Sequence, residues 1–177
     1  MKSALLLLAA LMTAPHAFCD VADSSANGFT VKITVQLQAA PADVYRKIVS
    51  VGDWWDSGHT FSGDAHNLTI DARAQGCFCE KLPNQGSVRH MDVVMAAPGQ
   101  RLVLTGGLGP LQTMAVTGAL TFQMAASEGG TKLDVTYAVA GYSAGGLASL
   151  AKLVDTVLTG QITRLKSLID KGTPAPK

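Results

Sequence analysis

Two short segments near the middle of the chain carry the residue types that could do chemistry. Residues 76–82 and 87–95 read as two strands, and the turn-forming run 83–86, Pro-Asn-Gln-Gly, joins them into a hairpin. With the turn centred between Asn84 and Gln85, residues opposite one another share a face, with Cβ atoms about 5 Å apart. One face then carries Cys77, Cys79, His90 and Asp92, and the other carries Phe78, Glu80, Arg89 and Met91.

The first face could hold a metal ion or a redox-active pair of thiols. Two thiols beside an imidazole suit zinc or copper, so Cys77, Cys79 and His90 are candidate metal ligands. Cys-x-Cys is, however, closer than the usual spacing in structural zinc sites, and both cysteines could instead pack as small apolar side chains. A Cys77–Cys79 disulfide is a third alternative. It needs a distorted strand, because residues two apart in a regular strand are separated by about 6.6 Å.

The second face places Glu80 opposite Arg89, which suggests an ion pair across the two strands. On the protein surface such a pair contributes only ~0–1 kcal/mol. Inside a cavity, the same two side chains could orient the carboxylate or hydroxyl of a ligand. Glu80 or His90 could also act there as a catalytic acid or base, provided that its pKa is shifted.

A long amphipathic helix near the C-terminus is the element most able to organise the fold around this hairpin. The spacing predicts a helix over 146–170, because apolar residues recur at steps of three and four along one stripe. The stripe consists of Leu147, Leu150, Val154, Leu158, Ile162, Leu165 and Ile169.

The rest of the chain reads as strands and turns. Residues 29–37 alternate strictly between apolar and polar side chains, as in a half-buried strand. Short helices follow over 41–51 and 53–56, and further strands over 68–73, 76–82, 87–95, 101–105, 114–124 and 133–139. The order predicts a single α+β domain, with a curved antiparallel sheet of about six to seven strands wrapped around the C-terminal helix.

The first residues have the pattern of a secretory signal. Lys2 supplies a positive charge, residues 4–12 form an apolar run, and Ala17 and Cys19 are small residues suited to cleavage. We expect a signal peptide over 1–19, a short linker over 20–27, the domain over 28–171 and a disordered tail over 172–177. Cleavage after Ala17, retention as a membrane anchor and lipidation at Cys19 are the alternatives. The protein is thus expected to be exported, to the periplasm or the medium.

The composition and charge of the chain limit the classes of partner that it could bind. The chain holds 14 Lys and Arg against 13 Asp and Glu, and removing Lys2 with the signal leaves 13 of each. A neutral chain without a basic run argues against nucleic-acid binding. No second apolar run reaches the ~18 residues that a membrane span needs. The glycines at 106–109 lack the strand–turn–helix setting of a phosphate-binding loop, and we predict no cofactor.

Several motifs resemble the SRPBCC superfamily, also called START-like or helix-grip proteins. They are the strand 29–37, Pro41-Ala-Asp-Val-Tyr followed by Trp54-Trp55, and the glycine-rich 141–146 before the last helix. Within it, residues 76–80, 86–90 and 108–112 resemble exported bacterial proteins labelled polyketide cyclase-like or heat-shock-protein ATPase activator-like. The resemblance implies the helix-grip fold and a cavity between sheet and helix for a hydrophobic ligand. The candidate ligand-binding residues are Trp55, Glu80, Arg89, Met91 and Tyr142.

Three functions are compatible with these residues. The leading hypothesis is an exported protein that binds a small hydrophobic or amphipathic molecule in the cavity. A cyclase- or hydrolase-like enzyme using Glu80 or His90 is the second. A metal or thiol protein using Cys77, Cys79 and His90 is the third. Whether the chain is an enzyme therefore stays open, with binding favoured. The oligomeric state is not predicted.

Overall fold

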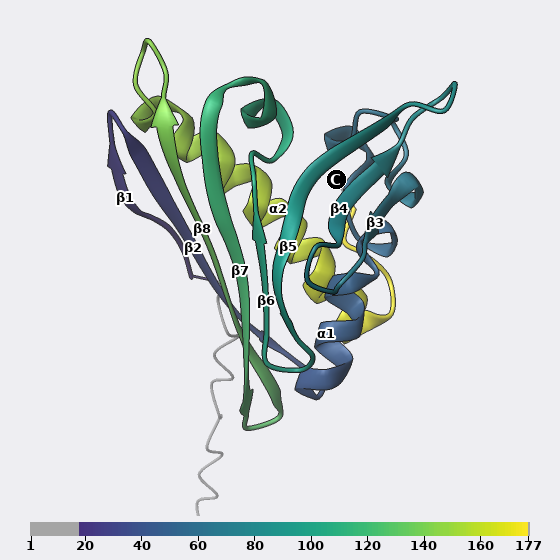
Figure 1. Cartoon of the computed structure of the whole chain (residues 1–177). Coiled ribbons are helices and arrows are strands. Elements are labelled where there is room, and N and C mark those ends of the chain that lie inside the picture. Colours follow the sequence, from purple (N-terminus) through teal and green to yellow (C-terminus); the bar gives the residue numbers. More distant parts are fainter. Residues whose placement is uncertain (1–17, 177) are drawn as a thin grey trace, which may run out of the picture.

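The computed structural model describes residues 18–176, and these form one antiparallel sheet with helices on one side (Figure 1). The sheet has eight strands in the order β1-β2-β8-β7-β6-β5-β4-β3. The strands are β1 Phe18–Ser25, β2 Gly28–Leu37, β3 Leu68–Ile70, β4 Cys77–Lys81, β5 Ser87–Ala97, β6 Arg101–Thr105, β7 Ala115–Ser127 and β8 Gly130–Tyr142. The helices are α1 Pro41–Val49 and α2 Ala148–Lys171, with 3-10 turns η1 Val51–Asp53, η2 Ser57–His59, η3 Ala65–Asn67 and η4 Gly109–Thr113.

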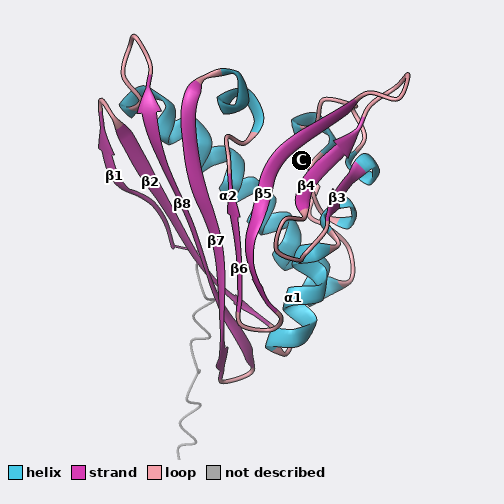
Figure 2. Cartoon of the chain, in the orientation of Figure 1, coloured by secondary structure: helices cyan, strands magenta, loops and turns pink. Residues whose placement is uncertain are grey.

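The long helix α2 crosses one face of the sheet, as the sequence predicts (Figure 2). Leu158, Ile162 and Leu165 from the predicted apolar stripe are buried in the common core. The helix begins at Ala148, two residues after the predicted start, because Gly146 adopts a left-handed φ of 74° that a helix does not allow. It ends before Gly172, whose φ of 80° is the usual left-handed stop of a helix.

The first strand corrects the predicted organisation of the N-terminus. Residues 20–27 are expected as a linker, but Phe18–Ser25 forms β1 and pairs with β2 at the edge of the sheet. Backbone hydrogen bonds hold an edge strand whatever its side chains, so a polar run such as Asp-Ser-Ser gives no alternation signal. The sheet thus has one strand more than the six to seven expected. The predicted signal peptide lies outside the described residues, except for Phe18 and Cys19.

The C-terminal segment, expected as a disordered tail, contacts α2. Residues 172–176 have no regular structure, yet the guanidinium of Arg164 on α2 donates a hydrogen bond to the carbonyl oxygen of Ala175. Arg164 also donates to the carbonyl oxygen of Trp54, at 2.9 Å. One side chain therefore ties the end of the chain to α2 and to the turn after α1. None of the helices within residues 18–176 is long and apolar enough to cross a membrane.

Candidate functional site

The hairpin of β4 and β5 is bulged, and the bulge decides which side chains meet. Cys77 lies opposite Asp92, as the sequence predicts, but the register shifts between Phe78 and Cys79. Cys79 then faces Arg89, and Glu80 faces Val88. The predicted pairs Cys79–His90 and Glu80–Arg89 are therefore wrong, because β5 carries one extra residue at the bulge.

The turn explains part of this shift. Lys81 pairs with Ser87, so the loop is centred on Asn84 instead of between Asn84 and Gln85. Both loop residues take left-handed φ values, 56° and 64°. The short polar side chain of Asn84 makes this conformation less costly there than it is for a branched residue.

Cys77 and Cys79 form a disulfide, the third of the predicted alternatives. Their Cα atoms are 5.4 Å apart, closer than the roughly 6.6 Å of a regular strand, so the shortened geometry accommodates the bond. His90 turns to the opposite face of the hairpin, where it meets Glu80. The predicted metal ligands are thus not brought together. Among residues 18–176, no group of three or more His, Cys, Asp or Glu side chains could hold a metal ion.

His90 and Glu80 form a buried pair, with side chains only 4% and 0% exposed. Nε2 of His90 lies 2.9 Å from a carboxylate oxygen of Glu80. The backbone amides of Phe61 and Ser62, in the loop after η2, both donate to the same carboxylate. Every polar atom of the Glu80 side chain therefore has a partner, as a buried charge requires.

The loop that supplies these amides is held by α2. The side-chain oxygen of the buried Gln161 accepts a hydrogen bond from the backbone amide of Asp56, at 2.8 Å. Its side-chain nitrogen lies 3.0 Å from Nδ1 of His59. A polar residue in the otherwise apolar face of α2 thus fixes the start of the segment that leads to Phe61.

Aromatic rings enclose the imidazole. Phe61 stacks on His90 with ring centroids 5.8 Å apart, and Phe78 packs on it at 5.0 Å. Trp55 meets Phe78 edge to face at 5.6 Å. Together these rings exclude water from the Glu80–His90 pair, which strengthens its hydrogen bond.

Burial and hydrogen bonding set the charges of the pair. Burial acts to raise the pKa of the Glu80 carboxyl, but hydrogen bonds from Ser62, Phe61 and His90 outweigh it and hold that pKa below its ordinary value. Burial lowers the pKa of the His90 imidazole by more than the Glu80 carboxylate raises it. At neutral pH the pair is a carboxylate and a neutral imidazole.

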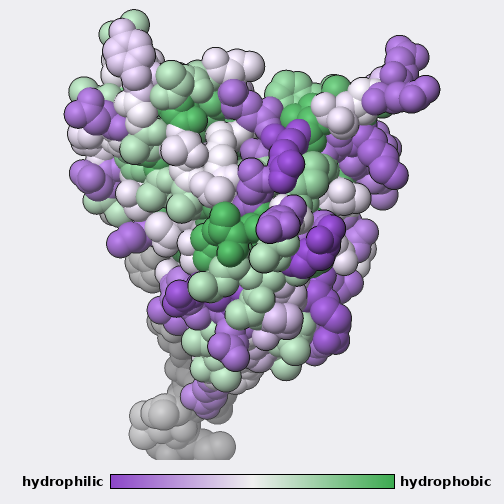
Figure 3. Space-filling view, in the orientation of Figure 1, coloured by the Kyte–Doolittle hydropathy of each residue, from purple (hydrophilic) through white to green (hydrophobic). Residues whose placement is uncertain are grey.

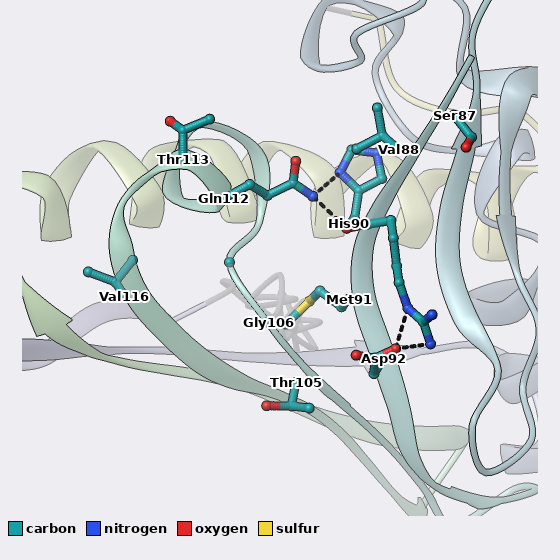
Figure 4. A pocket seen from close by; sticks show the side chains of 12 residues that line it. Ser87, Val88, His90, Met91, Asp92, Thr105, Gly106, Gln112, Thr113 and Val116 are labelled. Carbon is teal, nitrogen blue, oxygen red and sulfur yellow. Dashed lines mark hydrogen bonds and ion pairs between the residues drawn. The ribbon is translucent and has the colours of Figure 1, made fainter.

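This charge state assigns the tautomer of His90. A carboxylate only accepts hydrogen bonds, so Nε2 carries the proton and Nδ1 is left as an acceptor. Nδ1 faces the side-chain nitrogen of Gln112 on η4, at 3.5 Å, while the same nitrogen donates to the carbonyl oxygen of Arg89 at 2.9 Å. Figure 4 shows Gln112 reaching from η4 across to His90 on β5.

A pocket of about 480 Å³ opens beside this contact, between β5 and the segment that joins β6 to β7 (Figure 4). It forms because β5 pairs with β6 only from Asp92 onward, so its first half leaves β6. The lining residues comprise Ser87, Val88, Arg89, His90, Met91 and Asp92 from β5, then Thr105, Gly106, Gly107, Gln112, Thr113 and Val116. The lining is about equally polar and apolar. The sheet face in Figure 3 likewise mixes hydrophilic and hydrophobic residues.

Gly106 allows the two walls to approach at the base of the pocket. Its φ of 146° favours glycine, and a Cβ atom there would lie 2.9 Å from the carbonyl oxygen of His90. Tyr137 on β8 supports the same wall from inside, because its hydroxyl donates to the Gly106 carbonyl and accepts from the Leu108 amide. Burial raises the pKa of Tyr137 to about 12, so this hydroxyl keeps its proton.

Comparison with solved structures identifies the fold. CalU16 from Micromonospora echinospora superposes with a TM-score of 0.61 at 14% identity, over 92% of this chain and 88% of that one. A putative uncharacterized protein from Rhizobium leguminosarum gives 0.58 at 18% identity, over 88% and 98%. Aha1 from Colwellia psychrerythraea gives 0.55 at 13% identity, over 81% and 97%. The chain shares a helix-grip fold with these structures. No protein-family model and no curated protein sequence matches it.

Within this helix-grip fold, the pocket differs in place from the one predicted. The cavity is expected between the sheet and α2, whereas no residue of α2 lines the pocket described above. Arg89 and Met91 line it, as two of the predicted ligand-binding residues. Arg89 forms an ion pair with Asp92 and not with Glu80, because the bulge turns the two predicted partners to different faces.

The other three predicted ligand-binding residues lie outside the pocket lining. Glu80 is buried behind His90, and Trp55 is 6% exposed in the core, where its indole donates to the carbonyl oxygen of His59. Tyr142, at the end of β8, is 72% exposed. Glu80 therefore affects the pocket only through its contact with His90. Trp55 acts only through Phe78, which packs on His90.

Sequence reasoning missed Phe61, Ser62 and Gln112. Phe61 and Ser62 act through backbone amides and ring stacking, for which the sequence holds no signal beyond an aromatic residue in a polar loop. Gln112 lies in a segment read as a loop, and nothing in its spacing indicates contact with His90.

Proposed function

We propose that this chain is a binding protein for a small amphipathic molecule, which occupies the pocket between β5 and η4. One observation carries the proposal. A buried, neutral histidine and a glutamine amide meet at a pocket of about 480 Å³ that is also lined by Val88, Met91 and Val116. Its volume and its converging polar groups are typical of ligand sites.

The lining favours an amphipathic ligand over a purely hydrophobic one. Apolar surface buried from water would contribute roughly 25 cal/mol per Å² to the free energy of binding. This contribution favours binding but does not orient the ligand. The polar groups of His90, Gln112 and Thr113 would fix which end of the ligand points inward. A wholly apolar ligand would leave those groups without partners and would bind less well.

We further propose that the protein works in an exported compartment. The support is the charged, apolar and small-residue pattern of its first 19 residues. Binding and export together describe a carrier or scavenger of a small molecule outside the cytoplasm.

The test is native mass spectrometry of the mature protein purified from its exported compartment, followed by denaturation. A co-purified organic mass that is lost on denaturation is the expected result. The variant Val116→Trp fills the pocket and should abolish the adduct. The matched control is Val94→Trp, the same change at an exposed position on β5 outside the pocket lining, which should retain it. Equal adducts in both variants would contradict the proposal.

An enzyme remains the second candidate, because the Glu80–His90 pair has the form of an oriented general base. The carboxylate holds the imidazole in one tautomer and leaves Nδ1 as the unprotonated nitrogen that could accept a proton. A cyclase- or hydrolase-like reaction would then convert the bound molecule. Incubating the purified protein with its own co-purified ligand distinguishes the two, because a changed ligand mass appears only if a reaction occurs. His90→Gln should then stop the conversion.

A further inference from the structure

We infer that the molecule held in this pocket donates a neutral hydroxyl group, of a phenol or an alcohol, to Nδ1 of His90. The inference rests on the proposed binding function and goes further by naming the chemical class at the polar end of the ligand. It follows from the hydrogen-bond partners of Glu80, His90 and Gln112.

Glu80 fixes which nitrogen of His90 faces the pocket side. Two backbone amides, from Phe61 and Ser62, point at the carboxylate and hold it in the ionised form. The carboxylate in turn accepts from Nε2 of His90 at 2.9 Å. The remaining nitrogen, Nδ1, therefore has a lone pair to offer and no proton to give.

The existing contact of Nδ1 is weak. The Gln112 nitrogen lies 3.5 Å away, at the long limit of a hydrogen bond, while its other N–H donates to the Arg89 carbonyl oxygen at 2.9 Å. An acceptor that is almost fully buried and so poorly paired is costly. A hydroxyl donor arriving from the pocket would satisfy it at a normal distance, and Gln112 would keep its bond to Arg89.

The charges around the pocket argue against an anionic ligand. Its lining contains one permanent cation, Arg89, whose guanidinium is paired with the carboxylate of Asp92 on the same strand. The elements that contact the His90 ring add the carboxylate of Glu80 and the uncharged side chains of Phe61, Phe78 and Gln112. A carboxylate or phosphate would meet no unpaired positive charge there. It would also face Nδ1, which accepts hydrogen bonds, where an anion needs a donor.

Three probes that share the naphthalene ring test this: 2-naphthol, its methyl ether and 2-naphthoate, titrated into the wild-type protein at pH 7.5 by calorimetry. The naphthol should bind at least fivefold more tightly than the ether and than the naphthoate, because only the naphthol donates a neutral hydroxyl. Equal binding of naphthol and ether, or tightest binding of naphthoate, would overturn the inference and leave the binding function in place. Failure of all three to bind would count against both.

Glu80→Gln sharpens the test because it changes the tautomer and keeps the shape. The Ser62 amide still needs the side-chain oxygen, so the new NH₂ group takes the position that faces both Nε2 of His90 and the Phe61 amide. The Phe61 amide then loses its acceptor, and the imidazole proton moves to Nδ1. The variant should bind the ether as well as or better than the naphthol. An unchanged preference for naphthol in the folded variant would contradict the inference, and the wild-type comparison decides it if the variant does not fold.

Discussion

Two hairpins of the same sheet differ in the regularity of their strand register. In the β7–β8 hairpin the register runs without a shift from Ala115 opposite Tyr142 to Ser127 opposite Gly130, and buried apolar residues alternate along both strands. In the β4–β5 hairpin the register shifts once, and both His90 and Met91 are buried in succession. The regular hairpin builds core, whereas the bulged hairpin brings a carboxylate and an imidazole together away from water.

The difference shows how a sheet can acquire a polar site without losing its core. A bulge moves one side chain to the other face while its neighbours keep their positions. Here it moves His90 away from the cysteines and places it on the face of Glu80 and Phe78, where aromatic rings enclose it. Substitutions in one hairpin at a time should therefore have different effects on stability and on binding.

The largest effect should come from removing the carboxylate. Glu80→Leu leaves the amides of Phe61 and Ser62 and the Nε2 proton of His90 without an acceptor, and breaking a buried pair typically costs ~3–5 kcal/mol. Urea unfolding at pH 7 measures the loss. Adding His90→Phe should recover part of it, because the imidazole no longer needs a partner. Simple additivity of the two changes would show that the side chains are not coupled.

Breaking the regular hairpin should cost nearly as much for a different reason. Leu133 on β8 is fully buried, and Leu133→Ala should lower the free energy of unfolding by ~2–5 kcal/mol through lost contacts and a cavity. This loss should be the same at pH 5 and pH 7.5, and binding of 2-naphthol should be unchanged. A loss under 1 kcal/mol would mean that this hairpin does not carry the core.

Acid should weaken the bulged hairpin selectively. The pKa of His90 is below its ordinary 6.5 in the folded protein, so the unfolded chain binds the proton first as pH falls, and stability declines from about pH 6.5 downward. The pKa of Glu80 is also lowered, from 4.5, and adds a second decline below about pH 4.5. In His90→Gln the first decline should shrink, whereas in His66→Gln, at an exposed position, it should persist. Identical profiles would contradict the assignment.

The smallest effect should come from the disulfide. Cys77→Ser with Cys79→Ser opens a loop of very few residues, for which chain entropy predicts a loss of only ~1–2 kcal/mol. Both cysteines lie on the face away from His90, so binding of 2-naphthol should not change. Urea unfolding and probe titration, each with and without a reductant, measure the two effects. A reductant that alters the wild type but leaves the serine variant unchanged identifies the disulfide as the cause.

The elements with a regular apolar periodicity are predicted well from the sequence. The apolar stripe of α2 and the alternation in β2, β7 and β8 follow directly from burial of one face, and they suffice for the helix-grip fold. The sequence also singles out Glu80 and His90, but as members of different faces. A bulge adds one residue to one strand, and no property of Phe78 or Cys79 signals where the shift occurs.

The remaining parts of the site could not be predicted, because they depend on contacts distant in the sequence. Glu80 receives amides from a loop that is positioned by Gln161, and Nδ1 of His90 meets Gln112 from a turn between other strands. The predicted Glu80–Arg89 pair fails for the opposite reason. It assumes a regular register, which the local bulge replaces.

His90 is a buried neutral imidazole that carries its proton on Nε2, where it donates to Glu80. The most direct measurement is a long-range ¹H–¹⁵N spectrum of the histidine side chains in the ¹⁵N-labelled, ligand-free protein at pH 7.5, assigned with His90→Gln. The account predicts one Nε2-protonated ring with an unprotonated Nδ1, which loses this pattern in Glu80→Gln. An imidazolium signal for His90, or a proton on Nδ1 in the wild type, would contradict it.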